Sequence, residues 1–346
     1  MAIDSQTILI TGAGGWLGSL LPGKLVELEP ETSFKFVLAD IVEPKIPSSL
    51  KGTKSECITI KADLSDDSNM QALFTTKYGK PDVIYSMHGI MSLGSEENWD
   101  LGMRVNVDST RALLEKARHQ KTKQDKPITF IFTSSVATYG GQLPDEVLPS
   151  TSCTPEGAYG TEKLICEYYV TEYTRKGFVN GISIKLPTIV PRPGPPSRAT
   201  SAFVSGIVRE PLAGQEAICP IGSGLEDAIL QQTGVWVAKP STTLANFVKA
   251  KQLLSNTDLS KNILPWSRSV QLPGFTVSVH DIIQALRNVK GDDAVALIKF
   301  EHDETCKRIV SSWPRAFDNS YALSLGFIVD QDGFEGAIKE YRANHM

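Results

Sequence analysis

The chain has 346 residues, of which 41% are hydrophobic and 21% charged, and its formal net charge is -4. This length allows a large α/β domain or a nucleotide-binding domain with a smaller lobe, and we favour two lobes. The acidic balance and an ordinary 8% of aromatic residues argue against a nucleic-acid partner. Because the N-terminus lacks a signal-peptide pattern and no apolar run reaches membrane-spanning length, we expect a cytoplasmic protein without membrane contact.

The five cysteines and five histidines are scattered along the chain. Neither set has the spacing of a zinc site, and an odd number of cysteines without CxxC pairs does not suggest a disulfide framework. We therefore predict reduced cysteines and no metal ion.

The first predicted element is an apolar strand, residues 7–11, that runs into a glycine-rich turn. Its glycines are spaced as GxxGxxG, at Gly12, Gly15 and Gly18, and Trp16 and Leu17 open the helix that follows. A Cβ atom at each glycine would obstruct the sharp turn, the approach of a diphosphate to backbone amides, or helix packing. The motif therefore predicts a dinucleotide site, although any α/β protein can carry one such turn.

This first helix contains an unusual pair, Pro22 and Gly23, about one turn after its start. Pro22 removes the backbone hydrogen bond to Gly18 and its ring crowds that carbonyl. We therefore expect a kink or an early break of the helix.

The second predicted strand, residues 34–39, ends in Asp40. An acid roughly 20 residues after the glycine turn accepts hydrogen bonds from the adenosine ribose hydroxyls. Asp40 would repel a 2′-phosphate, and Ile41, Val42 and Glu43 supply no cation to neutralise one. The pattern therefore favours NAD over NADP, whereas the alternative for Asp40 is a solvated acid at a strand end.

Further apolar, β-branched strands alternate with amphipathic helices through the first half of the chain. The strands cover residues 57–61, 83–86, 128–134 and 182–186, and two of the helices cover 106–118 and 158–173. This alternation predicts an α/β fold, a Rossmann-type doubly wound parallel sheet, over residues 1–186.

After Leu186 the chain changes to a proline-rich segment, residues 187–198, which cannot form regular structure. Long ordered loops beyond the carboxyl edge of a sheet often carry substrate contacts. Helices are predicted at 201–212, 243–254, 279–289 and 316–325, with a short strand at 269–272. We therefore assign residues 187–346 mainly to a smaller C-terminal substrate lobe, with some segments returning to the nucleotide-binding domain.

The candidate chemistry begins with Tyr159 and Lys163, which lie one turn apart on a predicted helix and so share a face. A neighbouring ammonium and an oxidised nicotinamide both favour a phenolate, which makes Tyr159 a candidate base. The pair alone could equally be a surface helix pair. However, the predicted strand 128–134 places the hydroxyls of Ser134 and Ser135 at the carboxyl edge of the sheet, where ligands of such folds bind.

Taken together, these motifs resemble the extended short-chain dehydrogenase/reductase superfamily. The resemblance is carried by TGAGGWLG from residue 11, Asp40, Asn106, FTSSVATYG from residue 132, YGTEK from residue 159 and ALSLGF from residue 322. It spans nearly the whole chain and implies a Rossmann fold with bound NAD.

The resemblance also implies roles for single residues. Tyr159 would be the general acid/base, Ser135 would fix the substrate oxygen, and Lys163 would lower the tyrosine pKa and bind the nicotinamide ribose. Asn106 would hold a water that relays protons to Lys163. NAD contacts are implied for Gly12, Gly15, Trp16, Leu17, Gly18, Asp40, Asp63, Leu64, Tyr159, Lys163, Pro187 and Thr188. Ser134 is the neighbouring choice for the hydroxyl role, and the spacing to Tyr139 and Gly140 favours Ser135.

One segment departs from the family pattern. Residues 86–90, Ser-Met-His-Gly-Ile, stand where the family usually has a turn of small residues after the fourth strand. His88 is then a core residue, a ribose contact or a substrate ligand, and we favour the core.

Three stretches, residues 186–194, 205–214 and 311–314, are similar to one branch, the D-erythronate dehydrogenases. This implies NAD-dependent oxidation of a short sugar acid at its C2 hydroxyl to a 2-oxo acid. A substrate carboxylate prefers a guanidinium, and Arg192, Arg198 and Arg209 lie in and just after the proline-rich segment. We favour Arg192 and Arg209. Ser92 is a candidate substrate contact, although an ordinary loop serine explains it equally well.

Three alternative functions remain open. A nucleotide-sugar epimerase or dehydratase and a uronate dehydrogenase share the tetrad, and an NAD-binding sensor without catalysis is the non-enzymatic alternative. The family further implies a homodimer that pairs the helices 106–118 and 158–173.

Overall fold

A seven-stranded parallel sheet forms the centre of the molecule, and its strand order is β11-β7-β5-β4-β1-β2-β3. We analysed a computed structural model that describes residues 5–194, 202–311 and 313–346. The strands are β1 Ser5–Thr11, β2 Ser33–Asp40, β3 Glu56–Lys61, β4 Val83–Ser86, β5 Thr129–Ser135, β7 Asn180–Leu186 and β11 Ser269–Gln271. All six strands predicted in the first half are confirmed, and the short predicted strand from the second half adds the seventh. The strand order reverses between β1 and β4, where ligands of such sheets bind.

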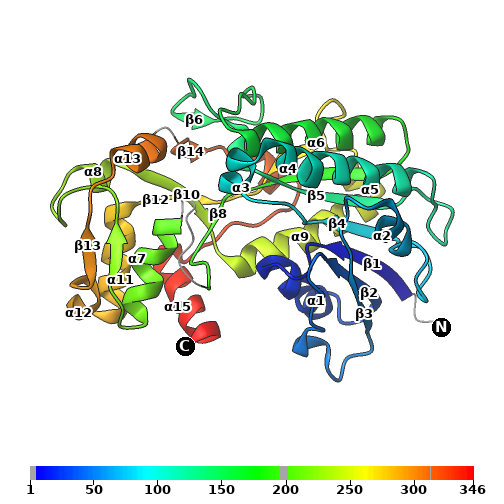
Figure 1. Ribbon diagram of the computed structural model, residues 1–346, viewed down its shortest axis with the longest axis horizontal. Helices are drawn as coiled ribbons and strands as arrows, with labels where there is room; N and C mark the ends of the chain where they lie inside the picture. Colours follow the sequence, from blue (N-terminus) through cyan, green and yellow to red (C-terminus); the bar gives the residue numbers. More distant parts are fainter. Residues whose placement is uncertain (1–4, 195–201, 312) are drawn as a thin grey trace.

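Helices cover both faces of this sheet (Figure 1). The helices α1 Trp16–Leu28 and α9 Pro240–Ser255 lie on one face, and α2 Asp67–Ala72, α5 Ser109–Arg118 and α6 Ala158–Arg175 lie on the other. Consecutive residues of β1 serve the two cores, because Ile8 and Ile10 pack with α1 and α9 while Leu9 packs with α5 and α6. A strand buried on both sides must be apolar throughout, which explains its sequence.

The helix α1 does not break at Pro22, so that part of the expectation is wrong. The helix continues to Leu28 with Pro22 inside it. Leu21, Pro22 and Leu25 are buried, and Leu21 and Leu25 belong to the core under the sheet. Gly23 allows the close approach of residues 48–50, since a Cβ there would lie 2.5 Å from the Ser49 hydroxyl. Tertiary packing therefore outweighs the missing hydrogen bond.

A second region, drawn at the left of Figure 1, has its own hydrophobic core. A separate small sheet of β6 Glu146–Val147 and β14 Ala316–Phe317 packs with Tyr139 and Trp236. The second region itself contains small sheets of β8 Thr188–Ile189, β10 Gly234–Ala238 and β12 Phe275–Ser278, and of β9 Ala217–Cys219 and β13 Ile298–Phe300. Its helices are α7 Ala202–Leu212, α8 Ile229–Gln232, α11 Val279–Lys290, α12 Asp292–Val295, α13 Glu304–Ser311 and α15 Gly333–His345. We retain the boundary near residue 186 as a proposal, with α9 and β11 as returning segments.

The helix predicted over residues 316–325 is only partly correct. Residues Ala316 and Phe317 form β14, which pairs with β6, and the helix α14 covers only Ser320–Ser324. The Asp318 carboxylate accepts the Ser320 amide hydrogen at 2.8 Å and so starts the helix late. The remaining elements are short: η1 Ser48–Leu50, α3 Ser92–Glu97, α4 Trp99–Gly102, the π-helical turn η2 Met103–Asp108, η3 Val136–Thr138 and α10 Thr257–Ser260.

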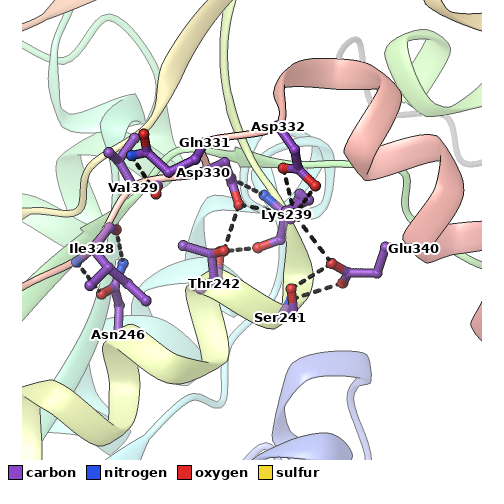
Figure 2. Close-up of polar contacts among 11 residues, drawn as sticks. Lys239, Ser241, Thr242, Asn246, Ile328, Val329, Asp330, Gln331, Asp332 and Glu340 are labelled. Atoms are coloured by element: carbon purple, nitrogen blue, oxygen red, sulfur yellow. Dashed lines mark hydrogen bonds and ion pairs between the residues drawn. The ribbon is translucent and has the colours of Figure 1, made fainter.

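The start of α9 is tied to the C-terminal part of the chain by a polar cluster around Lys239 (Figure 2). The Lys239 ammonium pairs with Asp332 at 2.7 Å and with Asp330 at 3.7 Å. Glu340 of α15 accepts the Ser241 amide hydrogen at 3.0 Å, and Asp330 accepts the Thr242 hydroxyl. Asp330 and Glu340 thus satisfy the amide hydrogens of Lys239 and Ser241 at the start of α9, which carries no side-chain cap of its own.

Two kinds of feature are absent from the part of the chain that the structure describes. No helix there combines the length and the apolar character needed to cross a membrane. No group of three or more His, Cys, Asp or Glu side chains there has the arrangement of a metal site.

Candidate active site

The glycine turn after β1 needs its glycines for steric reasons. Gly12 has a φ of +70°, and a Cβ there would lie 2.6 Å from the backbone of Met87 and His88 at the end of β4. A Cβ on Gly18 would lie 2.3 Å from the Gly12 carbonyl oxygen. Gly15 precedes α1 without a side-chain cap, so the amide hydrogens of Trp16 and Leu17 face the turn unblocked. A diphosphate fits this bare, positive helix end.

Asp40 lies directly beside the glycine turn. Its carboxylate accepts the Gly14 amide hydrogen at 2.9 Å and the Val42 amide hydrogen at 3.4 Å. Ile41 and Val42 are 60% and 71% exposed. No basic side chain follows Asp40 directly, and the turn and the acid together fit the adenosine half of NAD rather than NADP.

The proposed adenine contacts differ from one another in exposure. Asp63 is exposed, and hydrogen bonds from the Ser65 hydroxyl and amide lower the pKa of its carboxyl. Leu64 is buried in the core between β3 and α2. Asp63 therefore lies at the surface with its carboxylate already engaged by Ser65.

Tyr159 lies in the first turn of α6, and the Ser135 hydroxyl at the end of β5 is close enough to act on the pKa of its phenol. The Ser134 hydroxyl instead donates to Glu167. Burial, and then the charge of Glu162, raise the pKa of Tyr159 to about 12, against the effects of Ser135 and Arg192. The phenol is thus neutral at neutral pH, and the pKa is raised where the family resemblance implied a lowered one.

Lys163 lies beside that phenol and is almost completely buried. Its ammonium donates to the Thr133 carbonyl at 2.9 Å and stands 5.5 Å from the centre of the Tyr159 ring. Burial lowers the pKa of this ammonium, although the charges of Cys166, Glu162 and Glu167 oppose that effect. Tyr159, Lys163 and Ser135 are therefore brought together as the sequence predicted.

Asn106 lies in the π-helical turn η2, a geometry that is frequent at functional sites. Its side chain makes two hydrogen bonds with the backbone of Ile90. It accepts the amide hydrogen at 2.9 Å and donates to the carbonyl at 3.1 Å. It also donates to the Glu162 carboxylate at 2.6 Å, and Ser95 donates to the same carboxylate oxygen at 2.8 Å. Asn106 thereby holds the loop after β4 against α6.

His88 stands under the glycine turn, between β1 and α5. Its Nδ1 is 2.8 Å from the Thr11 hydroxyl and its Nε2 is 2.8 Å from the Ser109 hydroxyl. Burial and then the positive charge of Lys163 lower the pKa of the imidazole to about 3. Both ring nitrogens are engaged by the protein, which agrees with the core role favoured from the sequence.

The candidate substrate-binding residues differ in their exposure and in whether their side chains are already bound by other residues. Arg192 is exposed, and its charge is among those that act on the Tyr159 phenol. Arg209 is engaged within the lobe, because its guanidinium donates to the Arg192 carbonyl at 2.8 Å and pairs with Glu210 at 2.5 Å. Ser92 is exposed at the start of α3. Of the remaining calls on this side, Arg198, Ser201 and Ser312 lie outside the described residues.

Pro187 and Thr188 join the two regions of the molecule. Pro187 is buried directly after β7, and Thr188 starts β8, whose backbone pairs with β10. A cavity of about 630 Å³ lies between α1 and α15 and includes Trp16, Pro191 and Tyr341 among its lining residues. The helix α1, from its first residue on, and the segment after β8 therefore border one hollow between the regions.

Three buried charged groups around α6, Glu162, Glu167 and Lys185, were not predicted from the sequence. Glu162 contacts Asn106 and Ser95, whereas Glu167 pairs with Lys185 of β7 at 2.9 Å. Glu162 and Glu167 sit on a helix that reads as amphipathic, where a glutamate is usually exposed. The one sequence feature that could have indicated their burial was their position next to Tyr159 and Lys163 on the same helix.

Comparison with known proteins agrees with this geometry. Residues 8–227 match the NAD dependent epimerase/dehydratase family. The chain is 38% identical to a D-erythronate dehydrogenase of Haemophilus influenzae, covering 96% of this chain and 98% of that one. It is 36% identical to a D-erythronate dehydrogenase of Cupriavidus necator, covering 97% and 98%. A solved nucleoside-diphosphate-sugar epimerase from Agrobacterium tumefaciens superimposes with a TM-score of 0.88 at 33% identity, covering 100% of this chain and 96% of the other.

The sheet order, the glycine turn with Asp40 and the Tyr159–Lys163 helix agree with both the family match and the full-length relatives. The chain therefore belongs to the NAD dependent epimerase/dehydratase family, within the extended short-chain dehydrogenases/reductases, and is an NAD-dependent oxidoreductase.

Proposed function

We propose that the protein oxidises the C2 hydroxyl of a short sugar acid, a D-erythronate-like aldonate, to a 2-oxo acid. The observation that carries the proposal is the similarity, over nearly the whole chain, to two D-erythronate dehydrogenases. It is supported by the exposed cation Arg192, whose charge acts on the Tyr159 phenol.

The NAD contacts that we propose lie along the carboxyl edge of the sheet. Backbone amides of Gly15, Trp16 and Leu17 bind the diphosphate, with Gly12 and Gly18 leaving room for it, and Asp40 binds the adenosine ribose. Asp63 and Leu64 border the adenine, and Pro187, Thr188, Tyr159 and Lys163 border the nicotinamide ribose. When bound, NAD supplies the acceptor for the hydride that leaves C2.

Proton transfer falls to residues of this chain. Ser135 hydrogen-bonds the substrate hydroxyl, and Tyr159 removes its proton as the carbon–hydrogen bond breaks. Because burial keeps the pKa of Tyr159 near 12, the phenolate needs positive charge beside it, and Lys163 is the chain's own source. Asn106 steadies the loop after β4 and is the proposed holder of the relay water.

Arg192 is the proposed partner of the substrate carboxylate. A guanidinium binds a carboxylate through two parallel hydrogen bonds, which would fix C2 toward Tyr159. Arg209 instead supports Arg192 through its carbonyl, and Ser92 remains a second candidate for a substrate hydroxyl.

The decisive experiment replaces Tyr159 with phenylalanine. We expect turnover to fall by roughly a thousandfold or more, within the range of one lost acid/base group and its electrostatic role. NAD binding, measured by calorimetry, should change little. Tyr168→Phe is the matched control, because Tyr168 is on the same helix and 66% exposed. Substantial activity in Tyr159→Phe would refute the assignment.

The substrate class is tested by measuring net NADH formation with aldonates, uronates and nucleotide sugars. Accumulating NADH with a four-carbon aldonate supports the proposal. The solved nucleoside-diphosphate-sugar epimerase keeps an alternative open, and turnover of a nucleotide sugar without net NADH would favour it. A preference for uronates would identify a uronate dehydrogenase, and NAD binding without any turnover would indicate a sensor.

We also propose a cytoplasmic homodimer in which α5 and α6 pair between copies. The five cysteines are free thiols, as in a reducing compartment. Light scattering of the purified protein tests the dimer, and charge substitutions on the outer faces of α5 and α6 should dissociate it.

A further inference from the structure

The carboxylate of Glu162 is the most unusual buried group beside the site. The side chain is fully buried, and one oxygen, Oε2, accepts from both Asn106 at 2.6 Å and Ser95 at 2.8 Å. The other oxygen, Oε1, is buried without a hydrogen-bond partner among the described residues. A Cβ on Gly102 would lie 2.1 Å from Oε1, so the glycine makes room for this carboxylate.

A buried carboxylate is normally stabilised by a cation or by several donors. Glu167, on the same helix, follows this rule through its ion pair with Lys185. In the described parts of the chain, Glu162 has two neutral donors and no cation at ion-pair distance. A group kept in this state next to Tyr159 and Lys163 is a candidate for function rather than stability.

We infer that Glu162 is a positioning residue of the site: its carboxylate holds the Asn106 amide in place, and its negative charge opposes ionisation of the Tyr159 phenol. The first role follows from the contacts, since Asn106 in turn fixes both backbone groups of Ile90. The second follows from placement and charge. Glu162 lies three residues after Tyr159 on α6, a spacing at which side chains of a helix are neighbours, and a nearby anion disfavours a phenolate. Glu162 is accordingly the second cause, after burial, of the raised pKa of Tyr159.

Several other titratable groups face this region. They are Lys163 and Cys166 on α6, Glu96 on α3, His88 after β4 and Arg192 after β8. Arg104 and Asp108 of η2 are exposed. Lys163 and Arg192 favour a phenolate, and Glu162 opposes them, so the site balances charges of both signs close to the phenol.

The variant Glu162→Gln tests the charge, because the amide keeps the shape and can still accept from Asn106 and Ser95. Ultraviolet titration of the full chain without NAD gives the ionisation of Tyr159, as the difference from the same chain carrying Tyr159→Phe. Removing the anion should move the midpoint toward lower pH by about one unit. An unchanged midpoint would overturn the charge role. Glu172→Gln is the control, because it removes an exposed glutamate from the same helix.

A second variant, Glu162→Met, tests the positioning of Asn106. Methionine fills the space but accepts no strong hydrogen bond, so Asn106 loses the carboxylate acceptor on α6 and keeps its two bonds to Ile90. For Glu162→Met we expect kcat to fall on the order of tenfold at all pH values, with KM nearly constant. For Glu162→Gln we expect the maximal kcat to stay and the pH dependence of kcat to shift. Equal kcat values for the two variants across the pH range would overturn this role.

The inference rests on the proposed function only in taking Tyr159 as the base. The titration uses neither NAD nor substrate, so it stays decisive if the sugar-acid assignment fails. Loss of the sugar-acid assignment would show instead in the substrate panel, with the titration result unchanged.

Discussion

The two flanks of α6 differ in whether an opposite charge lies beside the buried carboxylate. On the flank that faces β7, Glu167 pairs with Lys185 and also accepts hydroxyl bonds from Ser134 and Ser269. On the flank that faces η2, the donors to Glu162 among the described residues are neutral, and Lys163 bonds a carbonyl. The β7 flank therefore compensates its charges and supports the fold. The η2 flank leaves its charges uncompensated, which is typical of a site that awaits a ligand.

The pKa values follow the same division. The pKa of Lys185 is raised, because Glu167 and Tyr139 outweigh burial, whereas burial lowers the pKa of Lys163. Lys185 and Lys163 are buried to a similar degree, but their pKa values shift in opposite directions, because, among the described residues, an anion lies close to Lys185 and not to Lys163.

The largest expected effect comes from Lys185→Met. This change leaves Glu167 as an unpaired buried charge, so we expect unfolding free energy to fall by about 3–5 kcal/mol in a denaturant titration. Lys163→Met should stay within about 1 kcal/mol of wild type, because it removes an uncompensated charge. Combining Lys185→Met with Glu167→Leu should recover most of the loss. Equal losses of unfolding free energy in Lys185→Met and Lys163→Met would contradict the difference between the two flanks.

Gly102→Ala should destabilise the η2 flank by about 1–3 kcal/mol through overpacking against Glu162. The same change made in a Glu162→Ala chain should cost much less, because the space is then vacant. A double-mutant cycle from thermal or denaturant unfolding measures this coupling. Additive effects would mean that the glycine does not accommodate the carboxylate.

His88 should make stability depend on pH. Its pKa is about 3 in the folded chain and near 6.5 when unfolded, so below pH 6.5 only the unfolded chain binds the proton. Stability is therefore present above pH 6.5 and falls as the pH drops, by about 1 kcal/mol between pH 6.5 and 5.5. The loss should disappear in His88→Gln but persist in His119→Gln, whose side chain is exposed. An identical pH dependence in all three chains would contradict the neutral imidazole.

The smallest effect is expected for Glu96→Ala. The Glu96 carboxylate accepts the Ala158 amide hydrogen at 3.0 Å and so caps the first turn of α6. Its loss should cost about 0.5–1 kcal/mol, as for other lost N-terminal caps. Glu97→Ala, next to it on α3 and also exposed, is the matched control. A larger effect of Glu97→Ala would rule out the capping role.

The parallel sheet was predictable because its strands are buried on both faces and read as continuous apolar runs. The glycine turn, Asp40 and the Tyr159–Lys163 pair were predictable because their spacing along the chain is local. The effect of Pro22 was not, since packing of α1 against α9 depends on residues more than 200 positions away. The roles of Glu162 and Lys185 were also not predictable, because their partners lie on other elements and no local sequence pattern indicates a buried charge.

The cluster around Lys239 has a consequence for the order in which the chain is made. The carboxylates that satisfy backbone amides at the start of α9 come from Asp330 and Glu340, which follow the helix by many residues. A ribosome makes these residues after α9, so the helix that covers one face of the first sheet is completed only once they have emerged. Nascent chains that stall before residue 330 should expose that face to chaperones, even though most of the sheet has already emerged.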